Sequence, residues 1–153
     1  MRTSILDVFA AGDCVEMRLE NDDRRKWFQM PLWSQAMHMG VHAAHCMVNS
    51  SIELPIEFEL FTHATQFFGF KVCLMGLYNG QGMSELHTVS YRRSSETEFV
   101  RLILYEGRIV GAVLIGDTGI ENTIENLILS EMDVSAYGEY IISPDFDISD
   151  YFD

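Results

Sequence analysis

The sequence predicts an α+β fold in which a strand and a helix come first, and an antiparallel sheet with a covering helix follows. Three observations lead to this class. A short apolar run ends in Gly-Asp near the start of the chain, and a long helical pattern begins at Pro31. Beyond Pro55, several runs rich in β-branched and aromatic residues precede a second helical pattern.

The composition is typical of a packed intracellular protein. The chain has 153 residues, of which 48% are hydrophobic and 12% aromatic. Its formal charge of −13 argues against nucleic acid as a direct ligand, because phosphates require a basic surface. The cysteines Cys14, Cys46 and Cys73 form no CxxC pair, so neither a zinc site nor a dithiol centre is indicated. No signal peptide or membrane span is predicted, and we expect the cytoplasm as the location, with the nucleus second.

The first element is expected to be a short buried strand at residues 7–11, ending at Gly12-Asp13, with a charged surface loop at 16–26. In open α/β sheets, ligands bind beyond the carboxyl ends of strands, where a glycine lets the backbone approach closely. The Asp13 carboxylate could accept a hydrogen bond from a ribose-like or ribityl hydroxyl. The alternative is an acid that only caps the turn after a buried strand.

The next element is a helix, because Pro31 suits its first turn and Asn-Ser-Ser at 49–51 suits its end. One stripe of small and apolar residues is suited to pack closely against a sheet: Leu32, Ala36, Gly40, Ala43 and Met47. Three histidines lie roughly opposite: His38, His42 and His45. Their spacing could bind zinc or copper, but no acidic partner shares their stripe. We therefore predict no metal, and interpret this side as a polar face or as a contact with another domain.

Strands dominate the region after Pro55. Residues 56–78 predict one or two strands with a turn near Phe68-Gly69, and a loop follows. Successive antiparallel strands are expected at residues 85–93, 98–107 and 108–116. The pair Glu106-Gly107 between two apolar runs predicts a tight hairpin turn.

A helix at residues 121–132 is expected to cover this sheet, because four apolar residues recur at helical spacing: Ile124, Leu127, Ile128 and Met132. The last residues alternate aspartate with apolar side chains and predict an extended acidic tail. A single strand and helix cannot bury each other adequately, since a lone strand has no sheet partner. We therefore expect residues 1–50 to be the C-terminal piece of a larger domain, 51–140 an α+β domain, and 141–153 the tail.

Three motifs in the same order resemble the pyridine nucleotide-disulfide oxidoreductase superfamily. Thr3 with Ala10-Ala11-Gly12-Asp13 resembles its second flavin motif, and "PLWSQAMHMGVHAA" (31–44) resembles the helix that follows in NADH-oxidase-like members. The stretch "VRLILYEGRIVGAVLIGDT" (100–118) is similar to the hairpin of the C-terminal domain in the same subgroup. The resemblance covers the C-terminal third of such an enzyme. It implies that residues 1–50 complete an FAD-binding domain and that 51–140 form an interface-type domain.

The resemblance also implies a site and a reaction. Gly12 and Asp13 would contact the ribityl chain of FAD, and the backbone N–H groups of Leu32 and Trp33 would face the flavin pyrimidine edge. A core aromatic is the alternative for Trp33. NAD(P)H would be the co-substrate that transfers a hydride to the flavin, while the catalytic residues and the electron acceptor stay open.

The sequence departs from the superfamily in two respects. No GxGxxG loop occurs, so the missing N-terminal FAD and NAD(P)H domains would be the main partners, and this chain alone should be inactive. No His-Pro pair occurs either, and His63 is the only histidine in the corresponding region. A second class of function therefore stays open: a shortened, non-catalytic interaction module that binds a protein partner through the sheet at 56–116.

Overall fold

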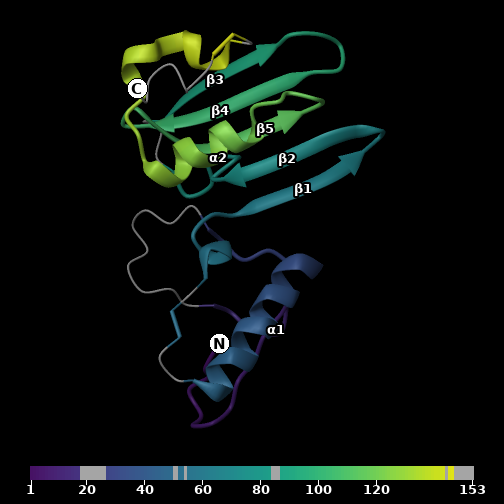
Figure 1. The fold of residues 1–153 in the computed structure, drawn as a ribbon, viewed down its shortest axis with the longest axis vertical. Coiled ribbons are helices and arrows are strands. Elements are labelled where there is room, and N and C mark those ends of the chain that lie inside the picture. Colours follow the sequence, from purple (N-terminus) through teal and green to yellow (C-terminus); the bar gives the residue numbers. More distant parts are fainter. Residues whose placement is uncertain (18–26, 50–51, 54, 84–86, 144, 147–153) are drawn as a thin grey trace. The chain divides into compact units, whose positions relative to one another are not determined.

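The computed structural model describes residues 1–17, 27–49, 52–53, 55–83, 87–143 and 145–146. The chain forms two compact units, Met1–Glu59 and Leu60–Asp153, and each is described by itself (Figure 1). A five-stranded antiparallel sheet together with helices confirms the predicted α+β class. None of the helices within the described ranges is both long and apolar enough to cross a bilayer.

The first unit is organised by the helix α1 (Trp33–Val48), which confirms the helix predicted after Pro31. A short 3-10 turn, η2 (Ile56–Phe58), follows it. The unit has a small core in which Met39 of α1 meets Trp27 and Phe58. The rings of Trp27 and Phe58 have centroids 5.4 Å apart.

The strand predicted at residues 7–11 does not form. The N-terminal segment instead folds back on itself, and the Thr3 N–H donates to the Val8 carbonyl (3.0 Å). The Ala10 N–H donates to the Met1 carbonyl (3.2 Å). The prediction was wrong because no strand lies beside this segment among the described residues of the unit, and a strand without a partner is not stable.

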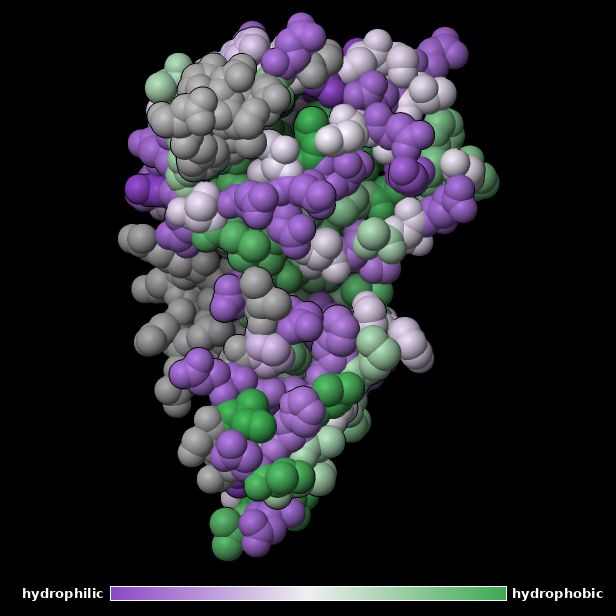
Figure 2. Space-filling view, viewed as in Figure 1, coloured by the Kyte–Doolittle hydropathy of each residue, from purple (hydrophilic) through white to green (hydrophobic). Residues whose placement is uncertain are grey.

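The buried side of α1 also differs from the predicted stripe. Of that stripe, Ala43 is buried, whereas Gly40 and Met47 are exposed. The buried residues of the helix are Met39, His42, Ala43 and Cys46. The helix turns this side inward because the long Met39 side chain fills the small core. Other apolar residues of the helix therefore stay at the surface, and Figure 2 shows hydrophobic side chains at the surface of this part of the chain.

The second unit is built on the five-stranded sheet. Its strands are β1 (Thr62–Phe67), β2 (Phe70–Gly76), β3 (Thr88–Arg93), β4 (Phe99–Tyr105) and β5 (Arg108–Ile115). They confirm the strands predicted in this region, including two strands where one or two were expected. Their order across the sheet is β1-β2-β5-β4-β3, so β2 pairs with β5 and not with the strand that follows it in the chain.

Two predicted hairpin turns are present. Phe68-Gly69 joins β1 to β2, and Glu106-Gly107 joins β4 to β5. The φ angles are 48° and 83° in the first turn, and 49° and 77° in the second. Positive φ at both central residues is the conformation of a type I′ turn, whose twist matches that of the flanking strands.

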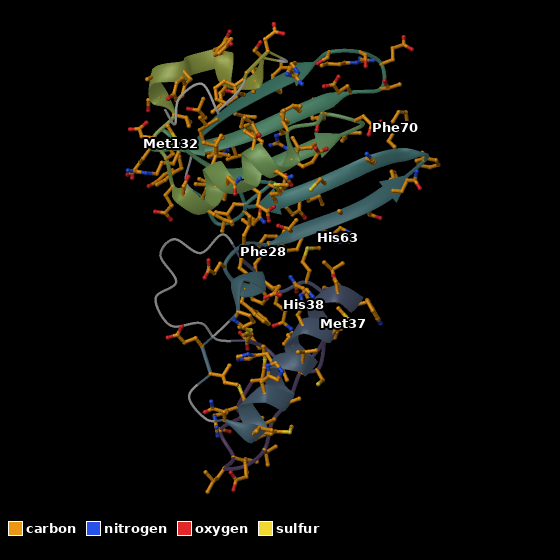
Figure 3. All side chains as sticks on the ribbon, viewed as in Figure 1. Phe28, Met37, His38, His63, Phe70 and Met132 are labelled. Atoms are coloured by element: carbon orange, nitrogen blue, oxygen red, sulfur yellow. The ribbon has the colours of Figure 1, made fainter. Side chains whose placement is uncertain are left out.

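One face of the sheet carries the core of the second unit. The helix α2 (Glu121–Ser130) lies across this face over β5 and β2 (Figure 1), as predicted. The core that joins the strands to the helix includes Met75, Val100, Leu102, Ala112, Leu114, Ile124, Leu127 and Ile128. Met132, labelled in Figure 3, lies just beyond the end of α2 and packs against the same core.

The chain after α2 continues to build this core. The 3-10 segment η3 (Ser135–Ile142) packs beside β3, and both Ile141 and Phe146 are buried. The first residues of the predicted acidic tail therefore belong to the core instead of extending into solvent. Residues 147–153 lie outside the described part, and the division into 1–50, 51–140 and 141–153 stays a prediction.

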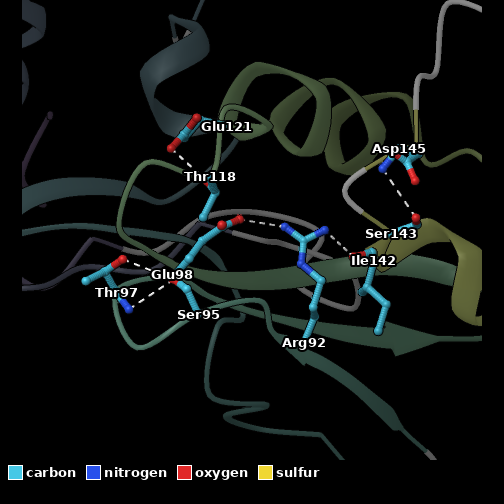
Figure 4. Close-up of polar contacts among 9 residues, drawn as sticks. All are labelled: Arg92, Ser95, Thr97, Glu98, Thr118, Glu121, Ile142, Ser143 and Asp145. Atoms are coloured by element: carbon cyan, nitrogen blue, oxygen red, sulfur yellow. Dashed lines mark hydrogen bonds and ion pairs between the residues drawn. The ribbon is translucent and has the colours of Figure 1, made fainter.

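An arginine ties η3 to the sheet (Figure 4). Arg92 of β3 donates to the backbone carbonyl of Ile142 and forms an ion pair with Glu98, at 2.8 Å between Nη2 and Oε1. The two charged side chains are only 11% and 25% exposed. Because both are shielded from water, removing one partner would leave the other charge poorly solvated and unpaired, which is costly.

Candidate functional site

The predicted site residues Gly12 and Asp13 lie in a turn and not at the end of a strand. Gly12 has φ 83°, a value that favours glycine, and its carbonyl accepts the N–H of Val15 (3.2 Å). Asp13 is exposed, and its carboxylate makes no hydrogen bond with the described part of the chain. The turn therefore presents a carboxylate that is available to a ligand.

This turn lies against the beginning of α1. A Cβ atom placed on Gly12 would be 3.5 Å from the Cβ atom of Ala36, in the first turns of the helix. The structure thus brings the Gly12-Asp13 turn and the start of α1 together. This juxtaposition does not depend on the strand that failed to form.

Two glutamines that the sequence analysis did not single out hold the segments around this turn. The Gln29 side chain donates to the Val15 carbonyl (2.7 Å) and accepts the Met17 N–H (3.0 Å). The Gln35 side chain accepts the Met30 N–H (2.7 Å). Gln35 is the third residue of α1, a position where glutamine commonly reaches back to the preceding backbone, and this signal could have identified it.

The start of α1 offers backbone donors. Leu32 is the N-cap residue, but its own N–H donates to the Met30 carbonyl (2.8 Å). The first N–H bonded within the helix is that of Ala36, which donates to the Leu32 carbonyl (3.0 Å). The N–H groups of Trp33, Ser34 and Gln35 have no partner among the described residues. Free donors thus begin one residue after Leu32.

The Trp33 side chain is 80% exposed. It therefore takes no part in the core of the first unit, which was the alternative to a contact with the cofactor. Contact of Leu32 and Trp33 with a flavin stays a prediction. Cys14, beside Asp13, is exposed, and its thiol donates to the Ala11 carbonyl, with Sγ 3.3 Å from the oxygen.

The three histidines of α1 differ in exposure: His42 is buried, His38 half-buried and His45 exposed. His42, expected on the outer side, is only 5% exposed, and its Nε2 lies 3.4 Å from the Cys46 sulfur. Burial, followed by the positive charges of the N-terminus and His45, lowers the pKa of His42. The His42 side chain points inward and packs against Phe58, with ring centroids 5.8 Å apart. Among the described residues, no group of three or more His, Cys, Asp or Glu could hold a metal.

His63 belongs to the second unit. It lies on β1 (Figure 3), where its side chain is half-buried and pairs in register with Leu74. No described residue of that unit forms a catalytic arrangement with it. The catalytic residues therefore stay unassigned.

Comparison with known proteins finds one matching family and several similar proteins. Residues 64–132 match the family described as Rubredoxin NAD+ reductase C-terminal domain. The whole chain is similar to proteins called "Pyridine nucleotide-disulfide oxidoreductase domain-containing protein 1": it is 49% identical to that of Danio rerio, 46% to that of Rattus norvegicus and 42% to that of Drosophila melanogaster. Each alignment covers 100% of this chain but only 32%, 31% and 33% of the respective relative. The chain thus spans about a third of the length of these relatives, and it matches their C-terminal third.

Proposed function

The chain belongs to the pyridine nucleotide-disulfide oxidoreductase family, whose C-terminal third it matches, and we propose that it forms the C-terminal portion of an FAD-dependent NAD(P)H oxidoreductase. One observation carries the proposal. The exposed carboxylate of Asp13 lies in a turn packed on the start of α1, where backbone N–H groups are free. A flavin requires an acceptor for the hydroxyl groups of its ribityl chain. It also requires donors for a carbonyl oxygen on its pyrimidine side.

The residues present fit this cofactor. When bound, FAD would supply the acceptance of a hydride from the nicotinamide. Asp13 would accept a hydrogen bond from a ribityl hydroxyl, and Gly12 would let the backbone approach it. The N–H groups at the start of α1 would donate to the pyrimidine edge, and the positive end of the helix would stabilise negative charge there. Since the Leu32 N–H is already used, Trp33 is the better candidate for this contact.

A second feature of α1 supports the proposal. Residues at helical spacing form an exposed apolar stripe that faces away from the small core: Trp33, Met37, Gly40, Val41, Ala44, Met47 and Val48. Trp33 and Val48, at its two ends, are 80% and 91% exposed. Such a stripe is typical of a helix that packs against a further layer. We expect the remainder of the flavin-binding domain, preceding this chain, to cover it.

The test is flavin retention in a full-length protein. The Rattus norvegicus relative would be produced with this chain in place of its C-terminal third, and flavin absorbance would be measured after desalting. Asp13→Ala should lower flavin affinity by about 1.5–3 kcal/mol, because a hydrogen bond to a charged group is lost. Asp145→Ala is the matched control, since Asp145 is also an exposed aspartate but lies in the second unit. Equal flavin content in both variants would contradict the proposal.

The alternative, a non-catalytic interaction module built on the sheet, has one observation in its favour. The face of the sheet opposite α2 carries apolar side chains that are only partly buried. If the hybrid protein binds no flavin while this chain still binds a protein through that face, the module is the better description.

A further inference from the structure

The face of the sheet opposite α2 is apolar over much of its middle, although an antiparallel sheet usually exposes polar residues on a face that meets water. Side chains alternate along a strand, so the neighbours of core residues point to this second face. The register places six of these side chains in two rows across the middle of the sheet: Leu74, Val113, Arg101 and Tyr91 in one row, and Ile115 and Phe99 in the next. We call these six residues the open face. The first row continues to His63 on β1, and the second to Arg93 on β3 and to Val72 and Thr65 on β2 and β1.

Within the second unit, only one end of this face is covered. A Cβ atom on Gly111 would lie 2.3 Å from the carbonyl carbon of Leu77, so the chain after β2 runs directly over Gly111. Beyond that point, no described element of the unit lies over the open face. Tyr91 is 69% exposed, and the other members are half-buried.

Arg101 lies in the middle of this face. Its direct cross-strand neighbours on this side are Val113 and Tyr91. It is half-buried, yet it makes no hydrogen bond or ion pair with any described residue. No aspartate or glutamate points to this face from the described strands, in a chain with 23 acidic residues and 10 basic ones. An arginine among apolar side chains gains most from a carboxylate partner, and the described strands of this unit supply none.

We propose that the open face is an interface for the N-terminal portion of the longer polypeptide, and that this portion presents an apolar surface with a carboxylate opposite Arg101. The inference rests on the proposed function, which supplies that portion. The chain spans about a third of the length of its relatives. In the longer polypeptide, the other two thirds would be tethered near the open face, and this tether would favour them over free proteins as its occupant.

The charges argue against a second copy as the occupant. Two open faces packed about a two-fold axis would bring together two copies of Arg101 and no carboxylate. Each copy would also carry a formal charge of −13. Like charges within an interface cost several kcal/mol, so a surface of opposite charge is the better partner.

Photo-crosslinking in the full-length hybrid protein tests the inference. Tyr91→p-benzoylphenylalanine keeps an aromatic side chain at an exposed position of the face. After irradiation, mass spectrometry should find crosslinks to the N-terminal portion of the same polypeptide, near an acidic residue. Crosslinks to a second copy, or none, would overturn the inference. Flavin content measured on the same sample separates the two proposals: flavin without these crosslinks rejects the interface alone, and crosslinks without flavin reject the proposed function alone.

Variants of Arg101 sharpen the test. Arg101→Glu should lower the crosslink yield about tenfold by placing like charges together. Lys71→Glu, the matched control, changes the charge equally on the other side of the sheet and should leave the yield unchanged. Arg101→Leu should also lower the yield, yet leave the isolated chain at least as stable, because it removes an unpaired half-buried charge. A loss of stability in the isolated chain would show that Arg101 has a structural role within the unit and would overturn the inference.

Discussion

Replacing Gly111 by alanine should destabilise the second unit and leave the first unit unchanged. Gly111 lies in β5, where the backbone of Leu77 and Tyr78 crosses the sheet. The new Cβ atom would be 2.3 Å from the Leu77 carbonyl carbon and oxygen, and 2.6 Å from the Tyr78 nitrogen. These are backbone atoms, which cannot rotate away as the end of a flexible side chain can.

The magnitude follows from two contributions. Overpacking of a well-filled site costs about 1–3 kcal/mol. Moving the crossing segment also weakens the hydrogen bond from the Leu77 N–H to the Val110 carbonyl (2.8 Å), which is worth about 1 kcal/mol. We therefore expect Gly111→Ala to lower the free energy of unfolding by about 2–4 kcal/mol.

Urea denaturation can follow each unit separately. The two tryptophans of the chain, Trp27 and Trp33, both belong to the first unit, so tryptophan fluorescence follows that unit. Hydrogen exchange in β4 and β5 follows the second. The second-unit midpoint should fall by about 1–2 M urea, while the fluorescence midpoint stays constant.

Gly40→Ala is the matched control. Gly40 lies inside α1, and a Cβ atom there would meet nothing within 4 Å. The same glycine-to-alanine change should therefore stabilise the first unit by about 0.5–1 kcal/mol through helix propensity. If Gly111→Ala leaves the second-unit midpoint unchanged, the close passage of the chain over Gly111 is refuted.

Three further outcomes are expected. Burial lowers the pKa of His42 from 6.5, so near and below that pH the unfolded state binds more protons, and fluorescence-monitored urea midpoints should fall on acidification. The fall should be much smaller in His42→Gln and only slightly smaller in His45→Gln, because the His45 charge is the least of the causes of the shift. Burial raises the pKa of the Cys73 thiol to about 11, so iodoacetamide at neutral pH should modify exposed Cys14 first, and mass spectrometry should find Cys73 modified only after unfolding. Arg92→Met breaks a shielded ion pair and a bond to η3, and should destabilise the second unit by about 1–3 kcal/mol, measured by circular dichroism.

The local parts of the fold could be predicted from the sequence. Runs rich in β-branched and aromatic residues identified the strands, and Glu106-Gly107 identified its hairpin, because these signals act over neighbouring residues. The position of β2 beside β5 was not predicted, since no short-range signal specifies a pairing between distant segments. Residues 7–11 have the composition of a strand, but a strand also needs a partner, which composition does not report.

The candidate site was predicted in part for a similar reason. The sequence placed Gly12-Asp13 near the start of α1, and the structure has them together. It could not show that the Leu32 N–H is used by Met30, because that bond depends on the path of the chain before the helix. It also could not orient α1: apolar residues occupy more than one side, and only the contact of Met39 with the core decides which side is buried.

The strand order of the second unit has a consequence for how this unit folds. The hairpins β1-β2 and β4-β5 each join strands through a two-residue turn, so each can form early at little entropic cost. The pairing of Val72 with Ile115 must instead close a long loop that contains β3 and β4. We therefore expect the two hairpins to form first and the docking of β2 on β5 to limit the rate. Mutations at that seam should slow refolding, whereas mutations at the far end of η3 should mainly accelerate unfolding.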